Sequence, residues 1–125
     1  MRVIIKNGEN EVIMDERRCI FVNVSKKVIR VFLDEIIYAE SSVRKLRLIC
    51  KNQVIEYYGK ISDLEHQLEG DSFARCHKSY IVNLEYLRSY DAKAIELLDG
   101  TSIPISKQRY HDTKNKIIDF YGKPL

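Results

Sequence analysis

The sequence predicts a mainly β, antiparallel domain with one short internal helix and one C-terminal helix. Apolar residues occur chiefly in short runs rich in Val, Ile, Phe and Tyr, separated by turn-forming residues, which is the pattern of strands joined by tight turns. Apolar residues with helical spacing occur in two stretches, 61–68 and 106–121. A length of 125 residues, of which 45% are hydrophobic, is enough for one domain with its own core.

The first half of the chain contains the signals of successive hairpins. Asn7-Gly8 lies between two apolar runs, and such a pair is a strong hairpin signal. A helical turn is expected at 33–35, between two further strands. The expected strands of this half are 2–5, 11–14, 19–24, 28–32, 36–40, 45–50 and 53–58.

The first helix is predicted directly after these strands. Ser62 and Glu65 have the spacing of a capping box, in which each side chain bonds the backbone of the other residue. Gly70 is the expected C-terminal stop, because glycine adopts the left-handed conformation that ends many helices. The apolar face comprises Ile61, Leu64 and Leu68.

The last third of the chain predicts a turn, a hairpin and the second helix. Residues 73–91 lack a regular alternation, and a kink or turn is expected at 76–80. Asp99-Gly100 predicts a hairpin between strands 94–97 and 101–103. Ser106 is the expected N-cap of the second helix, and Gly122 its stop. Ile105 and Tyr110 have the spacing of a hydrophobic staple. The inward face of this helix is expected to comprise Tyr110, Thr113, Ile117 and Tyr121.

Charge is sorted along the chain, although the formal net charge is only +3. Residues 42–60 contain five Lys or Arg and one Glu, and residues 106–116 contain four Lys or Arg and one Asp. Residues 61–72 between them contain four Asp or Glu and neither Lys nor Arg. Such sorting suits a surface with one basic face, which attracts polyanions. The alternative is a scatter of solvated charges with no common partner.

The sequence has no arrangement typical of an enzyme, a metal site or a cofactor site. It has neither a Gly-rich phosphate loop nor a Gly-x-Ser-x-Gly motif. Cys76 and His77 are a weak nucleophile–base pair, because neighbouring side chains of a strand point to opposite faces. Three widely spaced cysteines without a C-x-x-C motif favour free thiols in a reducing cytoplasm. No apolar run approaches the ~20 residues of a membrane span, and no signal peptide opens the chain.

Three ordered blocks of the sequence resemble a known family. Residues 34–41 are DEIIYAES, residues 73–83 are FARCHKSYIVN, and residues 97–106 are LLDGTSIPIS. They resemble the D-x-I-x-Y-x-E strand, the F-x-R-x-H block and the L-x-D-G-x-x-I-P hairpin and helix cap of the LytTR family of bacterial DNA-binding domains. The resemblance extends in order over residues 19–121, so it is much more specific than any single motif.

The resemblance implies an elongated fold of small antiparallel β-sheets with short helices. It also implies a transcription regulator that docks loops, rather than a recognition helix, into DNA grooves. In this chain those loops are 42–46, 75–79 and 106–109. Two of them coincide with the basic segments, and binding of phosphates requires clustered Lys and Arg. The candidate DNA-binding residues are Arg44, Lys45, Leu46, Lys78, Ser79, Lys107, Gln108 and Arg109.

The resemblance also predicts partners and domain organisation. The expected partner is double-stranded DNA with paired direct repeats, bound by two copies or a homodimer, without a cofactor or a membrane. The chain is expected to be a single domain over 1–125, with an N-terminal hairpin extension at 1–18 and the family match at 19–121. Those 18 residues leave no room for the receiver domain of many relatives, and both a standalone regulator and an excised effector domain stay open. The alternative function is a basic β-module that binds RNA or a protein.

Several candidates have a second interpretation. Leu46, where some relatives have His, either packs on a thymine methyl group or belongs to the core edge with Leu48 and Cys50. Cys76 is either a small buried residue or a redox-sensitive thiol whose modification blocks DNA binding. Gln108 either reads an adenine or is solvated. The polar residues of the central block that are expected to support the fold are Arg75, His77, Tyr80 and Asn83.

Overall fold

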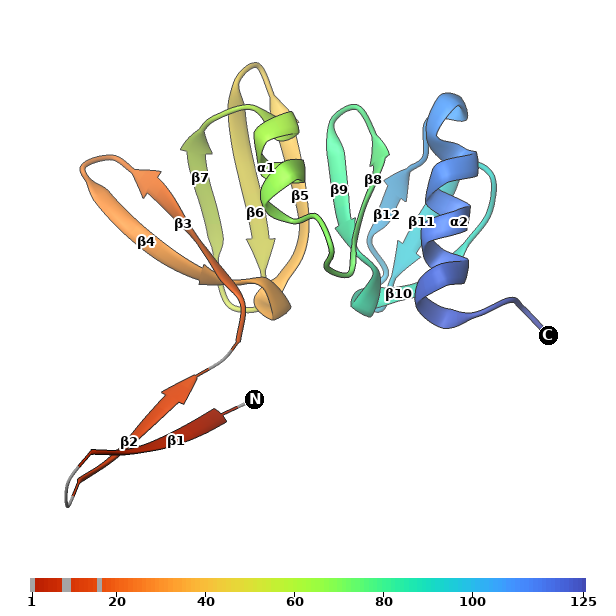
Figure 1. Ribbon diagram of the computed structural model, residues 1–125. Coiled ribbons are helices and arrows are strands. Elements are labelled where there is room, and N and C mark those ends of the chain that lie inside the picture. Colours follow the sequence, from red (N-terminus) through yellow and green to blue (C-terminus); the bar gives the residue numbers. More distant parts are fainter. Residues whose placement is uncertain (1, 8–9, 16) are drawn as a thin grey trace.

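A computed structural model describes residues 2–7, 10–15 and 17–125, and it contains a row of small antiparallel sheets with two α-helices (Figure 1). The five-stranded sheet has the order β7-β6-β5-β9-β8, which are Val54–Tyr58, Lys45–Cys50, Ile36–Ser42, Tyr80–Asn83 and Phe73–His77. The three-stranded sheet has the order β10-β11-β12, which are Leu87–Tyr90, Ala94–Leu97 and Ser102–Pro104. Two hairpins complete the strands: β1 (Arg2–Asn7) with β2 (Asn10–Asp15), and β3 (Cys19–Val24) with β4 (Lys27–Phe32). The predicted mainly β, antiparallel fold is confirmed.

The helical elements are short. They are α1 (Ile61–Gln67), α2 (Tyr110–Tyr121) and the 3-10 turns η1 (Leu33–Glu35), η2 (Leu84–Tyr86) and η3 (Lys107–Arg109). The helical turn predicted at 33–35 is therefore confirmed. The stretch that looked irregular, 73–91, is the β8–β9 hairpin followed by η2 and β10, with the expected turn at Lys78 and Ser79. In the β1–β2 hairpin Asn7 pairs with Asn10, and Gly8 of the predicted turn lies outside the described residues.

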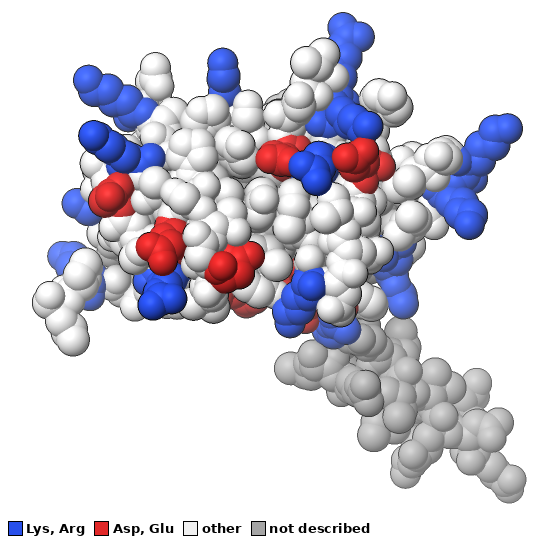
Figure 2. All heavy atoms as spheres, turned by 180° about the vertical axis from the view of Figure 1, so that it is seen from behind, with Lys and Arg blue, Asp and Glu red and all other residues white. Residues whose placement is uncertain are grey.

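Several strand-connecting turns lie along one edge of the molecule. In Figure 1 the β5–β6 and β8–β9 turns lie at the top, and the β3–β4 turn lies further down at the left. Figure 2 shows the molecule from behind, with Lys and Arg side chains projecting from this upper edge. The topology therefore brings together segments that are far apart in the sequence.

The larger core lies between the five-stranded sheet, the β3–β4 hairpin and α1. The alternating burial along strand β6 shows how the sheet contributes to this core. Leu46, Leu48 and Cys50 face inward, and the residues between them are exposed or half-buried. Helix α1 adds the predicted apolar face, since Ile61, Leu64 and Leu68 are all buried. At ~25 cal/mol per Å² of apolar surface, such burial is the main stabilising contribution to the fold.

The smaller core joins the β8–β9 hairpin to the three-stranded sheet. Cys76 and Val82 pack here with Ile95, Leu97 and Ile103. Helix α2 covers an adjoining cluster of Ala74, Leu84 and Ile117. Strands β8 and β9 contribute side chains to both cores, so this one hairpin connects them. Packing on both faces therefore fixes the position of the β8–β9 turn.

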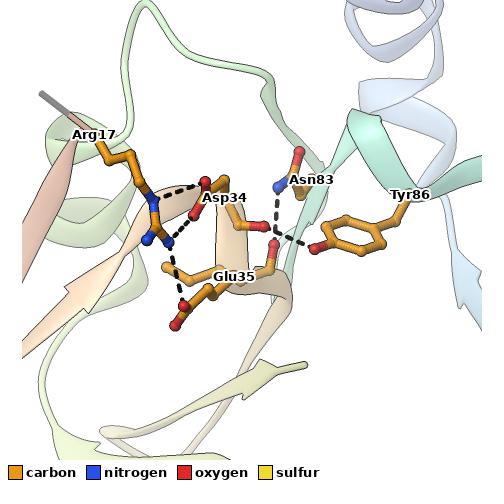
Figure 3. Close-up of polar contacts among 6 residues, drawn as sticks. Arg17, Asp34, Glu35, Asn83 and Tyr86 are labelled. Atoms are coloured by element: carbon orange, nitrogen blue, oxygen red, sulfur yellow. Dashed lines mark hydrogen bonds and ion pairs between the residues drawn. The ribbon is translucent and has the colours of Figure 1, made fainter. Parts of the chain in front are cut away.

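A fully buried asparagine links these layers. Asn83 is 0% exposed, and its amide Nδ2 donates to the backbone carbonyl of Ile36 at 2.8 Å (Figure 3). Its Oδ1 accepts from the Ser72 hydroxyl at 2.7 Å and from the backbone N–H of Glu85 at 3.1 Å. A buried amide with these partners avoids the cost of an unpaired polar group. The structural role expected for Asn83 is confirmed.

The same region is joined by polar contacts to η1. The Tyr86 hydroxyl donates to the backbone carbonyl of Asp34 at 2.7 Å (Figure 3). The Arg17 guanidinium donates to the Asp34 carboxylate at 2.7 and 3.0 Å and to Glu35 at 3.2 Å. The hydrogen bond from Arg17 lowers the pKa of Asp34. These contacts hold η1 between the β3–β4 hairpin and η2.

The capping box predicted for the first helix is wrong. Helix α1 begins at Ile61 with Lys60 as its N-cap, and no side chain caps it. The Lys60 carbonyl accepts from the N–H groups of Asp63 and Leu64, so Ser62 lies inside the first turn. Burial of Ile61 in the core sets the start of the helix two residues earlier than the local capping signal. The helix ends at a Leu68 C-cap, with Gly70 two residues further in a left-handed conformation at φ 81°.

The second helix begins through a 3-10 turn. Ser106 is the N-cap of η3, and its carbonyl accepts from the Arg109 N–H at 3.0 Å, but its side chain makes no capping bond. Thr113 and Ile117 are buried as predicted. Tyr121 is 54% exposed, although its hydroxyl donates to a backbone carbonyl of η2. Gly122 ends the helix at φ 90°, which confirms the predicted stop.

Candidate nucleic-acid interface

Backbone hydrogen bonds bring the three predicted loops side by side. The N–H of Ser41 donates to the carbonyl of Ser79 at 2.9 Å, which joins the end of β5 to the β8–β9 turn. The N–H of Ser106 donates to the carbonyl of Cys76 at 2.9 Å, which joins η3 to the same hairpin. We call this row of turns, residues 43–45, 78–79 and 107–109, the basic edge; it lies at the top of Figure 1.

The β5–β6 turn has an unusual backbone for its residues. Val43 and Arg44 connect the paired residues Ser42 and Lys45, and their φ angles are +45° and +66°. Positive φ at both central residues is the geometry of a type I′ hairpin turn, which favours Asn-Gly. Left-handed backbone costs roughly 1–2 kcal/mol for an ordinary residue, and a β-branched residue there is an outlier. Val43 is nevertheless 93% exposed, and no local sequence signal marks it as a functional residue.

The β8–β9 turn is ordered by the residues of the central motif. Arg75 donates from Nη1 to the Glu65 carboxylate at 3.0 Å and from Nη2 to the carbonyl of Lys78 at 2.8 Å. The His77 Nδ1 accepts from the N–H of Ser79 at 3.1 Å. Arg75 and His77 therefore shape the turn, and the Lys78 side chain is exposed. Their predicted structural roles are confirmed.

A shallow hollow separates this turn from η3. Its lining comprises His77, Lys78, Ser106, Gln108 and Arg109. The ring of Tyr80 meets that of His77 edge-on at 5.5 Å between centroids, which supports the side of the turn. The structure thus brings together Lys78 of one predicted loop and Gln108 and Arg109 of another.

Four candidate cations of the basic edge have no carboxylate partner in the part of the chain that the structure describes. Among the residues that the structure describes, no ion pair involves Arg44, Lys78, Lys107 or Arg109. The positive charge of these side chains is therefore not neutralised within the described chain. Arg44, Lys78 and Lys107 are exposed, and Arg109 is half-buried.

Lys45 differs from these four. Its Nζ lies 2.9 Å from the Glu56 carboxylate on the neighbouring strand. This hydrogen bond raises the pKa of Lys45 and lowers that of Glu56. Arg47 lies beside the same carboxylate at 3.1 Å and also pairs with Glu40. Lys45 therefore contributes less free charge to the basic edge than its sequence position suggested.

Leu46 belongs to the core. It is 1% exposed and packs in the larger cluster with Leu48 and Ile55. A base in a DNA groove cannot reach this side chain in the folded protein, so the assignment of Leu46 as a DNA-binding residue is wrong. Strand alternation turned it inward, which was the other interpretation of the sequence.

The redox interpretation of Cys76 is also wrong. Cys76 is 0% exposed, and its Sγ lies 3.5 Å from the carbonyl of Pro104. Burial raises the pKa of this thiol to about 12. The reactive form of cysteine is the thiolate, which is both disfavoured and shielded here. Cys76 is a small core residue.

Thiol labelling should show this protection. Native protein treated with iodoacetamide near neutral pH should leave Cys76 unmodified, and likewise Cys50, whose burial raises its pKa to about 11. Mass spectrometry of the intact protein measures the number of labels, and the same protein in urea serves as the control in which all three thiols react. Rapid labelling of Cys76 in the folded protein would contradict its placement in the core.

Two structural findings concern other kinds of site. In residues 2–7, 10–15 and 17–125, no helix has the length and apolar character needed to cross a membrane. Within the same ranges, His, Cys, Asp and Glu side chains do not gather in threes or more at a geometry able to hold a metal ion.

Comparison with known proteins agrees with this geometry. Residues 26–118 match the LytTr DNA-binding domain family. Accessory gene regulator protein A of Staphylococcus aureus is 44% identical over 62 residues, which cover 48% of this chain and 25% of that protein. The Staphylococcus epidermidis protein of the same name is 40% identical over 62 residues, with the same coverage. The match thus spans about a quarter of the length of these curated relatives.

The fold is also similar to that of a solved LytTr DNA-binding domain from Bacillus cereus. The TM-score is 0.68 at 19% identity, and the alignment covers 79% of this chain and 95% of that one. This similarity concerns the fold, and the family match concerns the sequence of residues 26–118. Together they show that the chain belongs to the LytTr DNA-binding domain family.

Proposed function

We propose that this chain is the DNA-binding part of a bacterial transcription regulator that recognises a specific double-stranded sequence by docking the basic edge into the grooves. The observation that carries the proposal is the row of four cations without carboxylate partners: Arg44, Lys78, Lys107 and Arg109. Unpaired cations along an exposed edge neutralise phosphates and release condensed counterions, which supplies most of the affinity for a duplex. The names of the staphylococcal relatives, accessory gene regulators, support a regulatory role.

The side chains of the edge divide naturally into two tasks. Lys78 and Lys107 are flexible single charges, suited to phosphates. Arg109 offers the bidentate donors that recognise guanine, and Gln108 beside it has the amide geometry that recognises adenine. The Ser79 hydroxyl donates to phosphate oxygens or bases equally well. Lys45 also binds DNA when a phosphate replaces the Glu56 carboxylate as the partner of its ammonium group.

The wider organisation follows from the family. We propose one DNA-binding domain over residues 19–121, preceded by the β1–β2 hairpin as an extension. Two copies would bind paired direct repeats in the bacterial cytoplasm, as a homodimer or as neighbours on the duplex. The function requires neither catalysis nor a cofactor.

Selection from a random duplex library at moderate salt tests the proposal. The purified chain should enrich a short motif, and fluorescence anisotropy should then show tighter binding to that motif than to a scrambled duplex. Single-stranded RNA of random sequence is the competitor that examines the alternative function. Failure to enrich any duplex motif, or stronger competition by RNA than by scrambled duplex, would contradict the proposal.

Single substitutions should separate the two tasks. Lys78→Ala should weaken binding to the motif and to scrambled DNA about equally, and it should flatten the slope of log K against log salt by about 1. Arg109→Ala should cost ~1–3 kcal/mol on the motif and relax the preference at one base position. Anisotropy titrations of both variants on both duplexes measure these effects, with Lys51→Ala on the β6–β7 turn as the matched control. Identical behaviour of the two variants would mean that the roles are assigned incorrectly.

A further inference from the structure

We propose that Val43 is a specificity-determining residue that packs against the C5-methyl group of a thymine. The inference rests on the proposed function and names a contact within it. It concerns the tip of the β5–β6 turn, where Val43 precedes Arg44.

The backbone of Val43 carries a conformational cost that the free protein does not recover. Val43 has a φ of +45°, a region in which β-branched residues are rarely found. A strained residue persists in a fold when packing compensates for it, but 93% of Val43 is exposed. Glycine or asparagine would form the same type I′ turn with less strain. Residues that contradict the local preference without a packing gain are typical of functional positions.

Val43 lies on the basic edge, among the residues proposed to bind DNA. Ser41 hydrogen-bonds to Ser79, so the turn that holds Val43 lies beside the β8–β9 turn on the basic edge. The N–H of Gly59 donates to the carbonyl of Arg44 at 2.9 Å, which anchors the turn to the end of β7. The Val43 side chain is therefore presented to solvent from an ordered backbone, next to a guanidinium that attracts phosphates.

The chemistry of the valine side chain suits contact with a methyl group. Valine forms no hydrogen bond to a base edge, but it can exclude water from the one methyl group that the major groove displays, which belongs to thymine. Leu46, three residues further along the chain, is buried and does not provide such a contact. Contact with a methyl group distinguishes thymine from cytosine and also from uracil, which differs from thymine only in that methyl.

Parallel selections test this assignment. Wild type, Val43→Gly and Val54→Ala are each used to select from the same random duplex library. Val54→Ala is the matched control, because Val54 is a half-exposed valine at the opposite end of the sheet, beside the β6–β7 turn. The motifs selected by wild type and by Val54→Ala should contain a thymine at one position. The motif selected by Val43→Gly should tolerate other bases at that position. Val43→Gly folds readily, since glycine suits the turn, and its melting temperature should equal or exceed that of wild type.

Each thymine of the recovered motif is then replaced by uracil in turn. At one position, wild type and Val54→Ala should lose about fourfold in affinity, the value of one buried methyl group, while Val43→Gly should bind both duplexes equally. If every uracil duplex binds wild type as well as its thymine parent, or if Val43→Gly keeps the full preference, the role of Val43 is refuted and the proposed function stands. If wild type recovers no motif, the proposed function fails, and this inference fails with it.

Discussion

Raising the NaCl concentration from 50 to 200 mM should lower the affinity of one copy for its duplex by roughly fortyfold. Arg44, Lys78 and Lys107, if each neutralises one phosphate, give a slope of about −2.7 for log K against log salt. Anisotropy titrations at four or more salt concentrations measure this slope directly. A slope near zero would contradict groove docking through the basic edge, because counterion release is the main source of affinity in that mode.

A pair of double variants attributes the slope to particular residues. Lys78→Ala with Lys107→Ala removes two cations of the basic edge and should flatten the slope by about 2. Lys51→Ala with Lys123→Ala removes the same charge from exposed sites outside the basic edge, on the β6–β7 turn and after α2. This matched control should leave the slope nearly unchanged. Equal slopes for the two double variants would mean that net charge, and not the edge, governs binding.

Leu46→Ala should destabilise the protein by about 2–5 kcal/mol. The substitution removes three carbons from a side chain that is 1% exposed in the larger core, so it loses transfer free energy and leaves a cavity. Urea unfolding followed by circular dichroism should show a lower midpoint with an unchanged m-value. At temperatures where the variant stays folded, its base preference should match that of wild type.

Leu98→Ala is the matched control for this measurement. Leu98 is 58% exposed beside the Asp99-Gly100 turn, and its truncation should change the unfolding free energy by no more than about 0.5 kcal/mol. A stable Leu46→Ala variant that lost its base preference would show that Leu46 reaches DNA after all. The two leucines thus separate a role in the core from a role at the interface.

The sequence by itself determined the elements whose signals are local. The Asp99-Gly100 pair placed one hairpin, strand alternation in β6 placed Leu48 and Cys50 on one face, and Gly122 placed the end of α2. Such signals act over a few residues, so no partner strand is needed to interpret them. The three family blocks then located the loops of the basic edge, because they occur in a fixed order along the chain.

Only the tertiary structure decided which of these loop residues are accessible to DNA and which carry a charge that no neighbour neutralises. Leu46 and Cys76 were placed in the core because another layer covers their face of the sheet, and alternation does not reveal which face is covered. Lys45 was partly neutralised because the β6–β7 register sets it near Glu56, and register depends on pairing across a turn. Val43 acquired its strained φ from the two-residue turn that this pairing imposes. Each outcome depends on strand pairing or on packing between layers, which the pattern of a single segment does not encode.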